Sequence, residues 1–231
     1  MRPASDGERL YAASHDGDVL ALDPKNGRTV WRAATKLPLA GGPGAGSGRV
    51  IAGSSEGDVI ALNAADGKAG LEGPRQRRVL AAPAVGSDIV VIRTVDGRLV
   101  GLNLADGQER WNTEQQVPRL SLRGTAAPVI IGDVVVCGFD NGKVVSVSLA
   151  DGGVQWETQV ASSKWRTELA RLVDIDSMVQ PVDKDLYVVG FQAVQSCWRW
   201  TRTDLVVTRF ESSDRGLVVD AERSDITDAR W

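Results

Sequence analysis

The stretch HDGDVLALDPKNGRTVW, residues 15–31, decides the fold of this chain. It holds two turn signals, Asp16-Gly17 and Asn26-Gly27, and between them neighbouring side chains of residues 18–23 face opposite sides. This period of two indicates a β-strand rather than a helix. Asp-Gly and Asn-Gly suit hairpin turns because both residues tolerate positive φ. The predicted strands cover residues 10–14, residues 18–23 and a segment that begins at Thr29.

The same pattern returns three more times along the chain. The glycine of the first turn recurs at positions 17, 57, 97 and 142, spaced by 40, 40 and 45 residues. A second turn pair follows each first pair by ten residues, and a Trp stands four residues beyond three of them, as Trp31, Trp111 and Trp156. A repeat of about 40 residues with two tight turns is typical of a β-propeller blade. We therefore predict an all-β fold, a β-propeller of four-stranded blades, in which each Trp packs between adjacent blades and its N–H finds a carbonyl oxygen.

The repeat fails in two places. Leu71 stands at the Trp position of the second unit, and residues 69–78 hold Gly, Pro and three Arg where a strand is expected. Residues 193–209 carry two Trp and three Arg with no turn signal. Back-translated with common codons and read in a shifted frame, both segments permit strings that restore the repeat. We hypothesise that small deletions in the coding DNA shifted the frame twice; a chance match, which codon degeneracy allows, is the alternative.

These breaks shape the expected domain organisation. We expect one partial propeller, about four intact blades and a damaged fifth, which cannot close into a ring and leaves strand edges unpaired. The expected boundaries are 1–231 for the single domain, 8–190 for the regular repeats, and 69–78 and 193–231 for the irregular parts.

Composition narrows the class of protein. The net charge of −3 and the pI near 5.3 argue against nucleic acid as the main partner. No apolar run reaches the length of a membrane span, and the segment Met1 to Ala4 shows no apolar part of a signal peptide. Cys137 and Cys197 suggest neither a disulfide framework nor a zinc site. We predict that Cys137, in a Val-rich strand, is a small buried hydrophobe.

Few residues are candidates for catalysis. His15, the one histidine, falls in a predicted turn, and Ser14 before it cannot face it along an extended strand. Residues 41–46, GGPGAG, lack the Lys-Ser/Thr of a phosphate-binding loop, and we interpret them as a loose connection between blades. We expect a protein that is not an enzyme and that uses no cofactor and no metal.

Two longer segments add a resemblance to the repeat. The unit Ala21-Leu22-Asp23, Asn26-Gly27 and Trp31 resembles the PQQ-type propeller repeat, which enzymes and scaffolds share. The segment VPRLSLRG, residues 117–124, accounts for the five extra residues in the 45-residue spacing, and TELARLVDID follows at residues 167–176. Together these features resemble the BamB family of the outer-membrane β-barrel assembly machinery.

The resemblance implies an eight-bladed, non-catalytic propeller at the periplasmic face of the outer membrane. In this family an N-terminal lipid forms the membrane tether, and its acceptor cysteine is absent from this sequence. The implied partners are the POTRA domains of BamA and unfolded outer-membrane proteins, whose folding and insertion the family assists. The implied BamA-binding residues are Leu120, Leu122, Arg123, Asp174 and Asp176.

The residues themselves leave alternatives open. Leu120 and Leu122, exposed in a polar loop, would anchor an interface, with Arg123 supplying a charge-assisted bond. Alternatively, both leucines pack between blades and Arg123 pairs with a neighbouring acid. Asp174 and Asp176 also fit a solvated loop or, with further oxygen ligands, a calcium site. The alternative functions are a PQQ-dependent dehydrogenase-like propeller and a generic propeller module that binds another protein.

Overall fold

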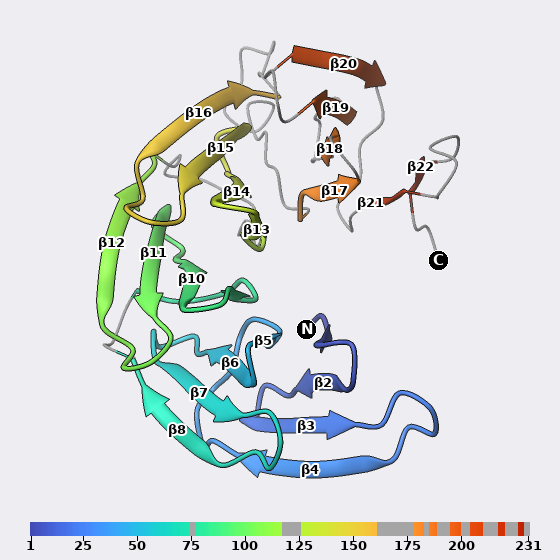
Figure 1. Cartoon of the computed structure of the whole chain (residues 1–231), viewed down its shortest axis with the longest axis vertical. Helices are drawn as coiled ribbons and strands as arrows, with labels where there is room; N and C mark the ends of the chain where they lie inside the picture. Colours follow the sequence, from blue (N-terminus) through green and yellow to red (C-terminus); the bar gives the residue numbers. More distant parts are fainter. Residues whose placement is uncertain are drawn as a thin grey trace. The chain divides into compact units, whose positions relative to one another are not determined.

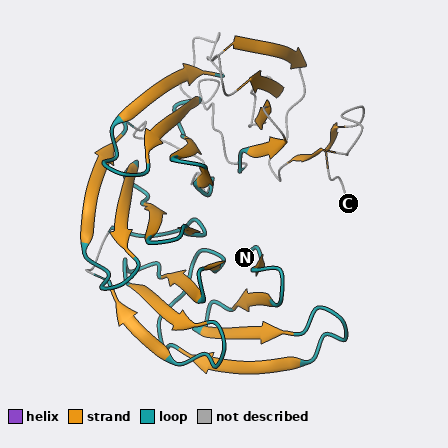
Figure 2. Cartoon of the chain, viewed as in Figure 1, coloured by secondary structure: helices purple, strands orange, loops and turns teal. Residues whose placement is uncertain are grey.

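The structure, a computed structural model, describes most of the chain. Backbone and side chains are described for residues 1–70, 73, 77–116, 126–160, 178–182 and 186–188, and the backbone alone for residues 71–72, 185, 195–199, 204–209, 217–219 and 226–228. All regular elements among these residues are β-strands (Figure 2). No helix of the described residues is long and apolar enough to cross a membrane. The chain divides into two compact units, Met1–Glu114 and Gln115–Trp231.

Unit 1 holds three four-stranded antiparallel sheets, each with its strands in chain order (Figure 1). Blade 1 comprises β1 (Ala4–Ser5), β2 (Leu10–Ala13), β3 (Asp18–Leu22) and β4 (Thr29–Ala34). Blade 2 comprises β5 (Gly44–Gly46), β6 (Arg49–Gly53), β7 (Val59–Asn63) and β8 (Ala69–Glu72). Blade 3 comprises β9 (Ala84–Val85), β10 (Ile89–Arg93), β11 (Arg98–Asn103) and β12 (Glu109–Glu114).

Unit 2 holds two further four-stranded sheets and one two-stranded sheet. Blade 4 comprises β13 (Val129–Ile131), β14 (Val134–Gly138), β15 (Lys143–Ser148) and β16 (Val154–Gln159). Blade 5 comprises β17 (Gln180–Val182), β18 (Asp185–Val188), β19 (Gln195–Arg199) and β20 (Asp204–Arg209). The last pair is β21 (Leu217–Val219) and β22 (Ile226–Asp228). The predicted all-β fold of four-stranded blades is therefore confirmed.

Both segments that break the sequence repeat contribute strands. β8 lies where residues 69–78 were expected to be irregular, but it has four residues where β4 and β12 each have six. β19 and β20 lie within residues 193–209, and β19 pairs with β18 on one side and with β20 on the other. Backbone hydrogen bonding thus continues the blade pattern where the turn and Trp signals are missing from the sequence.

A bulge in the outermost strand directs the Trp of the repeat. Ala21 pairs with Trp31 but Leu22 pairs with Thr29, so Val30 is an extra residue in β4. The same register shift occurs between β11 and β12 and between β15 and β16. A bulge bends its strand and re-aims the adjacent side chain. In blade 1 the side chain beside the bulge is that of Trp31.

Trp31 joins blade 1 to blade 2, as the sequence predicts. Its indole is buried, and Nε1 donates a hydrogen bond to the carbonyl oxygen of Ala64 in blade 2 at 2.9 Å. The ring lies 5.9 Å from the ring of Tyr11, centroid to centroid. A Cβ on Gly67, whose φ is 72°, would lie 2.6 Å from Trp31 Cε3. Glycine at the second turn of blade 2 therefore lets that turn approach the indole face.

The glycine-rich segment 41–46 is not the loose connection predicted from its composition. Its first four residues are buried, and its last three form β5. A Cβ on Gly41 would lie 2.5 Å from the carbonyl oxygen of Ala81, and one on Gly42 would collide with the carbonyl oxygen of Arg2. The segment is glycine-rich because the innermost parts of adjacent blades approach backbone to backbone.

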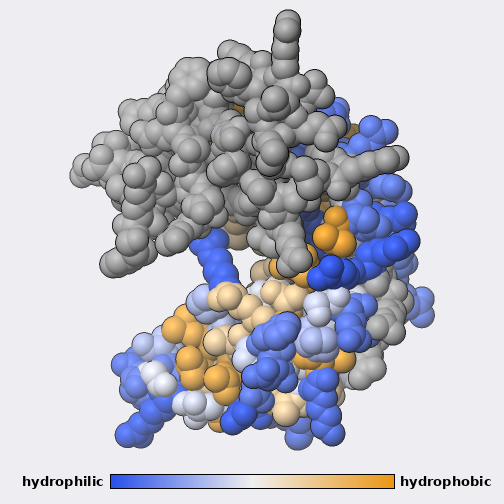
Figure 3. All heavy atoms as spheres, turned by 180° about the vertical axis from the view of Figure 1, so that it is seen from behind, coloured by the Kyte–Doolittle hydropathy of each residue, from blue (hydrophilic) through white to orange (hydrophobic). Residues whose placement is uncertain are grey.

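Exposed apolar side chains are scattered over the described surface. The large ones are Met1, Leu10, Val30 and Val154. On the face drawn in Figure 3, hydrophobic residues in the lower part lie among hydrophilic ones. Single exposed hydrophobic residues are normal on the surface of a folded protein. A binding site must therefore be argued from specific contacts.

Candidate partner-binding site

The five residues predicted to bind a partner fall in two connections between blades. Leu120, Leu122 and Arg123 lie between β12 and β13 in the sequence, and Asp174 and Asp176 lie between β16 and β17. All five are outside the described residues, so their roles stay predictions. We call residues 117–125 the first segment and residues 161–177 the second segment. The described residues at their ends show where each is attached.

One turn of blade 4 contacts the residue that precedes each segment. This turn, residues 139–142, joins β14 to β15, and we call it the blade 4 turn. Asn141 Nδ2 donates to the carbonyl oxygen of Gln116, the residue before the first segment, at 2.8 Å. The amide of Val160, the residue before the second segment, donates to the carbonyl oxygen of Gly142 at 3.0 Å. Gln159 Nε2 also donates to the carbonyl oxygen of Asn141 at 2.8 Å.

The blade 4 turn is itself well fixed. Phe139 is fully buried, and Asp140 is 4% exposed. The Gly142 amide donates to the carbonyl oxygen of Phe139 at 3.0 Å, and the Lys143 amide donates to Asn141 Oδ1 at 3.0 Å. Gly142 has φ of 75°, which glycine adopts without strain. The residues that precede the two segments are therefore bonded to a turn with a defined backbone.

The residue after the first segment also contacts blade 4. Cys137, in β14, is fully buried, which confirms its prediction as a small core residue. Its Sγ lies 3.7 Å from the carbonyl oxygen of Ala126, the residue after the first segment. The described residues on either side of the first segment, Gln116 and Ala126, thus contact β14 and the turn that follows it.

Sequence reasoning did not single out Asn141. The signal was present in the repeat, because the residue before the first turn glycine is acidic in three units and an amide in the fourth. The residues at this position are Asp16, Glu56, Asp96 and Asn141. A carboxylate can only accept hydrogen bonds, whereas an amide also donates.

The two residues weighed for catalysis each bond to a backbone group. His15 is exposed in the turn between β2 and β3, as predicted, and its Nδ1 lies 2.9 Å from the carbonyl oxygen of Leu39. A carbonyl only accepts, so Nδ1 carries the proton. Ser14 Oγ accepts the amide of Asp18 at 3.2 Å. Within the described part of the chain, no three His, Cys, Asp or Glu residues form a group that could hold a metal ion.

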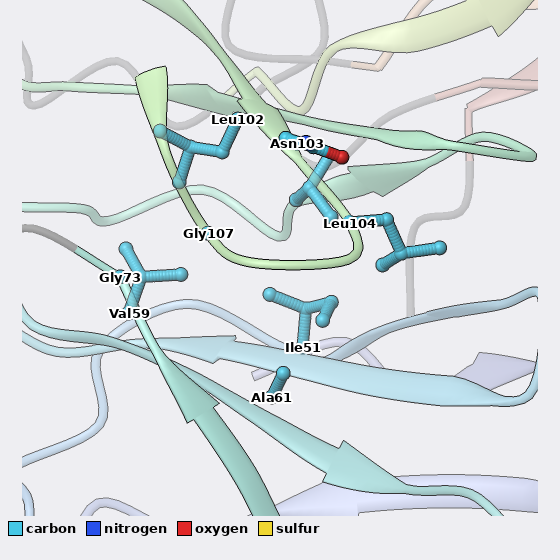
Figure 4. Close-up of a pocket in the computed structure, with 9 residues that line it drawn as sticks. Ile51, Val59, Ala61, Gly73, Leu102, Asn103, Leu104 and Gly107 are labelled. Atoms are coloured by element: carbon cyan, nitrogen blue, oxygen red, sulfur yellow. The ribbon is translucent and has the colours of Figure 1, made fainter. Parts of the chain in front are cut away.

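A small apolar cavity lies between blades 2 and 3 (Figure 4). Its volume is about 20 Å³, room for about one water molecule. In the repeat, Ala61 corresponds to Ala21, the partner of Trp31, and Gly107 corresponds to Gly67 beneath the indole. The lining residues are Ile51, Val59, Ala61, Gly73, Val90, Leu102, Asn103, Leu104 and Gly107. The cavity thus occupies the place of a repeat Trp, and the sequence has Leu71 at that position.

A wider cleft of about 580 Å³ lies between the turns of blades 1 and 2. Tyr11 Oη donates to Asp6 Oδ2 at 2.6 Å, and Arg9 Nη1 donates to the carbonyl oxygens of Ala64 and Ala65 at 2.6 and 3.0 Å. Burial, and then the bond to Asp6, strongly raises the pKa of Tyr11. Burial also acts to raise the pKa of Asp6, but the bonds from Tyr11 and two backbone amides outweigh it and lower this pKa. Arg9 thus bonds blade 1 to blade 2, whereas Asp6 and Tyr11 are bonded to each other within blade 1.

The blades and the Trp contact define the class of protein, a β-propeller with PQQ-like repeats. A family model described as outer membrane protein assembly factor BamB matches residues 15–228. The chain belongs to this family.

Three similar proteins illustrate the relationship. Outer membrane protein assembly factor BamB of Nitrosomonas eutropha is 50% identical over 46 residues, which are 20% of this chain and 11% of that protein. The crystal structure of BamB from Moraxella catarrhalis aligns with a TM-score of 0.86 and 25% identity over 94% of this chain and 66% of that one. A quinohemoprotein alcohol dehydrogenase from Pseudomonas putida aligns with a TM-score of 0.67 and 16% identity over 88% of this chain and 40% of that one, a likeness of fold alone. The matches thus span less than two thirds of the curated relative and just under two thirds of the Moraxella chain.

Proposed function

We propose that this chain is a non-catalytic scaffold of the outer-membrane β-barrel assembly machinery, at the periplasmic face of the outer membrane, and that it binds the POTRA domains of BamA. Family membership over residues 15–228 is the observation that carries the proposal. The proposed contact residues are Leu120, Leu122 and Arg123 in the first segment and Asp174 and Asp176 in the second.

The attachment of both segments to the blade 4 turn supports a shared binding surface. Gln116 and Val160 are each hydrogen-bonded to this turn. Leu120 lies four residues after Gln116, so even an extended chain keeps it within about 14 Å of that anchor. Leucines at a loop supply apolar anchors for a partner, and Arg123 adds a directional charge-assisted bond. The two aspartates would pair with basic groups of the partner and fix its orientation.

The test is the affinity of the full chain for a purified BamA POTRA fragment, measured by biolayer interferometry. We expect Leu122→Ala and Arg123→Ala each to raise the Kd by about tenfold or more, as for central interface residues. Val154→Ala is the control, because Val154 is 48% exposed in the outermost strand of the same blade. Absence of binding by the wild-type chain, or equal affinities for all variants, would refute the proposal. Calcium-dependent quinone binding would instead favour the dehydrogenase-like alternative.

The scaffold also has strand edges that suit unfolded outer-membrane proteins. β4 and β16 each stand at the end of their sheet. An edge strand can accept a substrate strand through main-chain hydrogen bonds with little sequence preference. We expect a photo-crosslinking residue at Gln155, exposed in β16, to capture unfolded outer-membrane proteins. If substrates crosslink only to other components of the machinery, this part of the proposal fails.

A further inference from the structure

The cleft of about 580 Å³ between blades 1 and 2 has no part in the proposed function. Its walls come mainly from three turns of unit 1, which join β1 to β2, β5 to β6 and β7 to β8. The volume falls within the range of about 300–1,000 Å³ that ligand pockets occupy in proteins. What the cleft can bind therefore depends on the polar side chains that line it.

Arg9 lines this cleft with a guanidinium whose position is fixed. Its backbone is held at the end of the β1–β2 turn, because the Arg9 amide donates to Asp6 Oδ1 at 2.8 Å and the Arg9 carbonyl oxygen accepts Ser5 Oγ at 3.1 Å. At the other end of the side chain, Nη1 donates to the carbonyl oxygens of Ala64 and Ala65 in blade 2. The guanidinium therefore reaches across the cleft in one orientation.

One edge of the Arg9 guanidinium is available to a ligand. Among the described residues, neither Nε nor Nη2 of Arg9 has a hydrogen-bond partner. These two nitrogens form one edge of the group, and their parallel N–H bonds match the two oxygens of a carboxylate. Arg49 stands at the same position of blade 2, but its Nη1 lies beside β8 of its own blade, 2.6 Å from a Cβ placed on Gly70. The repeat alone thus does not produce the arrangement at Arg9.

The carboxylates of the cleft determine which charge a ligand needs beside its own carboxylate. Asp6 is already bonded, because Oδ2 accepts Tyr11 Oη and Oδ1 accepts the amides of Glu8 and Arg9. Glu8 is exposed, lines the cleft and forms no ion pair within the described part of the chain. Two carboxylates and one guanidinium give the cleft a formal charge of −1, which repels a simple anion. A basic group near the carboxylate of the ligand offsets that repulsion.

We propose that this cleft binds an extended peptide in which an acidic residue lies close to a basic one. The Nε–Nη2 edge of Arg9 takes the carboxylate, and Glu8 takes the basic group. Asn63 at the cleft wall uses Oδ1 for the Ala65 amide, and its Nδ2, which has no partner among the described residues, donates to a main-chain carbonyl of the peptide. The site goes beyond the proposed function, because it uses none of the residues proposed to bind BamA.

The probe is a blocked peptide, Ser-Lys-Gly-Glu-Gly-Lys-Ser, added to the isotope-labelled full chain and followed by NMR. Shifts of the Ala64 and Ala65 amides give the Kd and report whether the peptide lies in the cleft. Replacing the central Glu of the peptide by Gln should raise the Kd by about tenfold, the effect of one charge-assisted hydrogen bond. Replacing both Lys by Gln should raise the Kd by about threefold, because an exposed ion pair contributes less.

Variants of the chain assign these two effects to residues. In Arg9→Lys the ammonium still donates to the carbonyl oxygen of Ala64 but offers no fork, so the Glu and Gln peptides should differ by less than about threefold. In Glu8→Gln the two Lys of the peptide should no longer affect the Kd. Arg49→Lys is the matched control, because Arg49 has the same repeat position and does not line the cleft. It should leave all peptide affinities unchanged.

A fourth variant, Ala65→Trp, fills the cleft without touching Arg9. Ala65 is exposed in the β7–β8 turn, and blade 1 has Lys25 at this repeat position, so a long side chain is compatible with the turn. The indole should raise the Kd of every peptide by about tenfold or more, as expected when a partner loses its central contacts, while the melting temperature stays unchanged.

Each outcome decides the proposal. Equal affinities of the wild-type chain for the Glu and Gln peptides, or shifts confined to amides outside blades 1 and 2, overturn it. A dependence on Lys alone indicates general attraction to an acidic chain and overturns it as well. A difference between the Glu and Gln peptides that persists in Arg9→Lys overturns the role of Arg9. If Arg9→Lys does not fold, Ala65→Trp decides, since unchanged binding by that variant places the peptide outside the cleft.

Discussion

Removal of the Trp31 indole is the most direct test of how blades 1 and 2 hold together. Trp31 is 9% exposed, contacts Tyr11 and Gly67, and donates to the carbonyl oxygen of Ala64. A buried Trp removes about 150–250 Å² from water, and at about 25 cal/mol per Å² this gives an upper estimate of about 4–6 kcal/mol. We therefore expect Trp31→Ala to lower the free energy of unfolding of unit 1 by about 3–5 kcal/mol, the range for such truncations.

Trp31→Phe separates the hydrogen bond from the packing. The phenyl ring keeps much of the apolar contact but loses the N–H donor. The carbonyl oxygen of Ala64 still accepts from Arg9 Nη1 at 2.6 Å, so it is not left unsatisfied. The expected cost is about 1–2 kcal/mol, one ordinary hydrogen bond and some lost area. Adding Arg9→Met removes the second donor, and the double variant should lose about 1–3 kcal/mol more than the two single costs combined, because a buried carbonyl is then unpaired.

The assay is urea unfolding of the full chain, followed by hydrogen exchange of peptides from β3 and β7. Far-UV circular dichroism provides the overall transition, since the other tryptophans make fluorescence ambiguous. Val30→Ala is the neighbouring control. Val30 is 47% exposed at the bulge, and its truncation should cost less than about 0.5 kcal/mol. If Trp31→Ala cost no more than Val30→Ala, or if the Trp31→Phe and Arg9→Met costs were simply additive, the inter-blade role derived for the indole would be wrong.

Three further outcomes are expected. Leu71→Trp should place an indole where the repeat has one. The added burial should raise the free energy of unfolding, measured by urea unfolding, by about 1–2 kcal/mol. A loss of stability would contradict the match between the cavity and the Trp position. Gly41→Ala should destabilise unit 1 by about 1–3 kcal/mol, because the new Cβ would lie 2.5 Å from the carbonyl oxygen of Ala81, and an unchanged urea midpoint would refute the close approach. The lowered pKa of Asp6 means that its ionised form stabilises the fold above its unfolded pKa of about 3.9 and that this contribution is lost as the pH falls below that value. The stability difference between wild type and Asp6→Asn should thus be present at neutral pH and shrink in acid, and a difference that grows in acid would contradict the assignment.

Much of the fold could be predicted because its signals are local. The turn pairs of residues 15–31 set the hairpins, and the alternation in residues 18–23 set the strand, as β3 confirms. A contact between residues distant in the sequence could be predicted only where the same residue recurs in several repeat units, as the Trp at position 31 does. β8 shows the limit, because its sequence lacks the Trp signal and its strand follows from pairing with β7.

The candidate site, too, could be predicted from the sequence only in part. The two segments were found from sequence because a five-residue insertion and a distinctive run of residues stand out against a regular repeat. Asn141 was not found, because an Asn-Gly turn has the same local chemistry whether or not its amide meets a carbonyl 25 residues earlier.

The sequence by itself thus determined the blade, its turns, its Trp and the positions of the inserted segments, since each depends on neighbours in the chain. Only the tertiary structure decided which backbones approach each other. It revealed that Gly41 lies against Ala81 and that Asn141 holds Gln116. Such contacts arise when separate blades and connections pack against each other. Position 41 must lack a Cβ and position 141 must supply a hydrogen-bond donor, and in both cases the reason is an atom distant in the sequence.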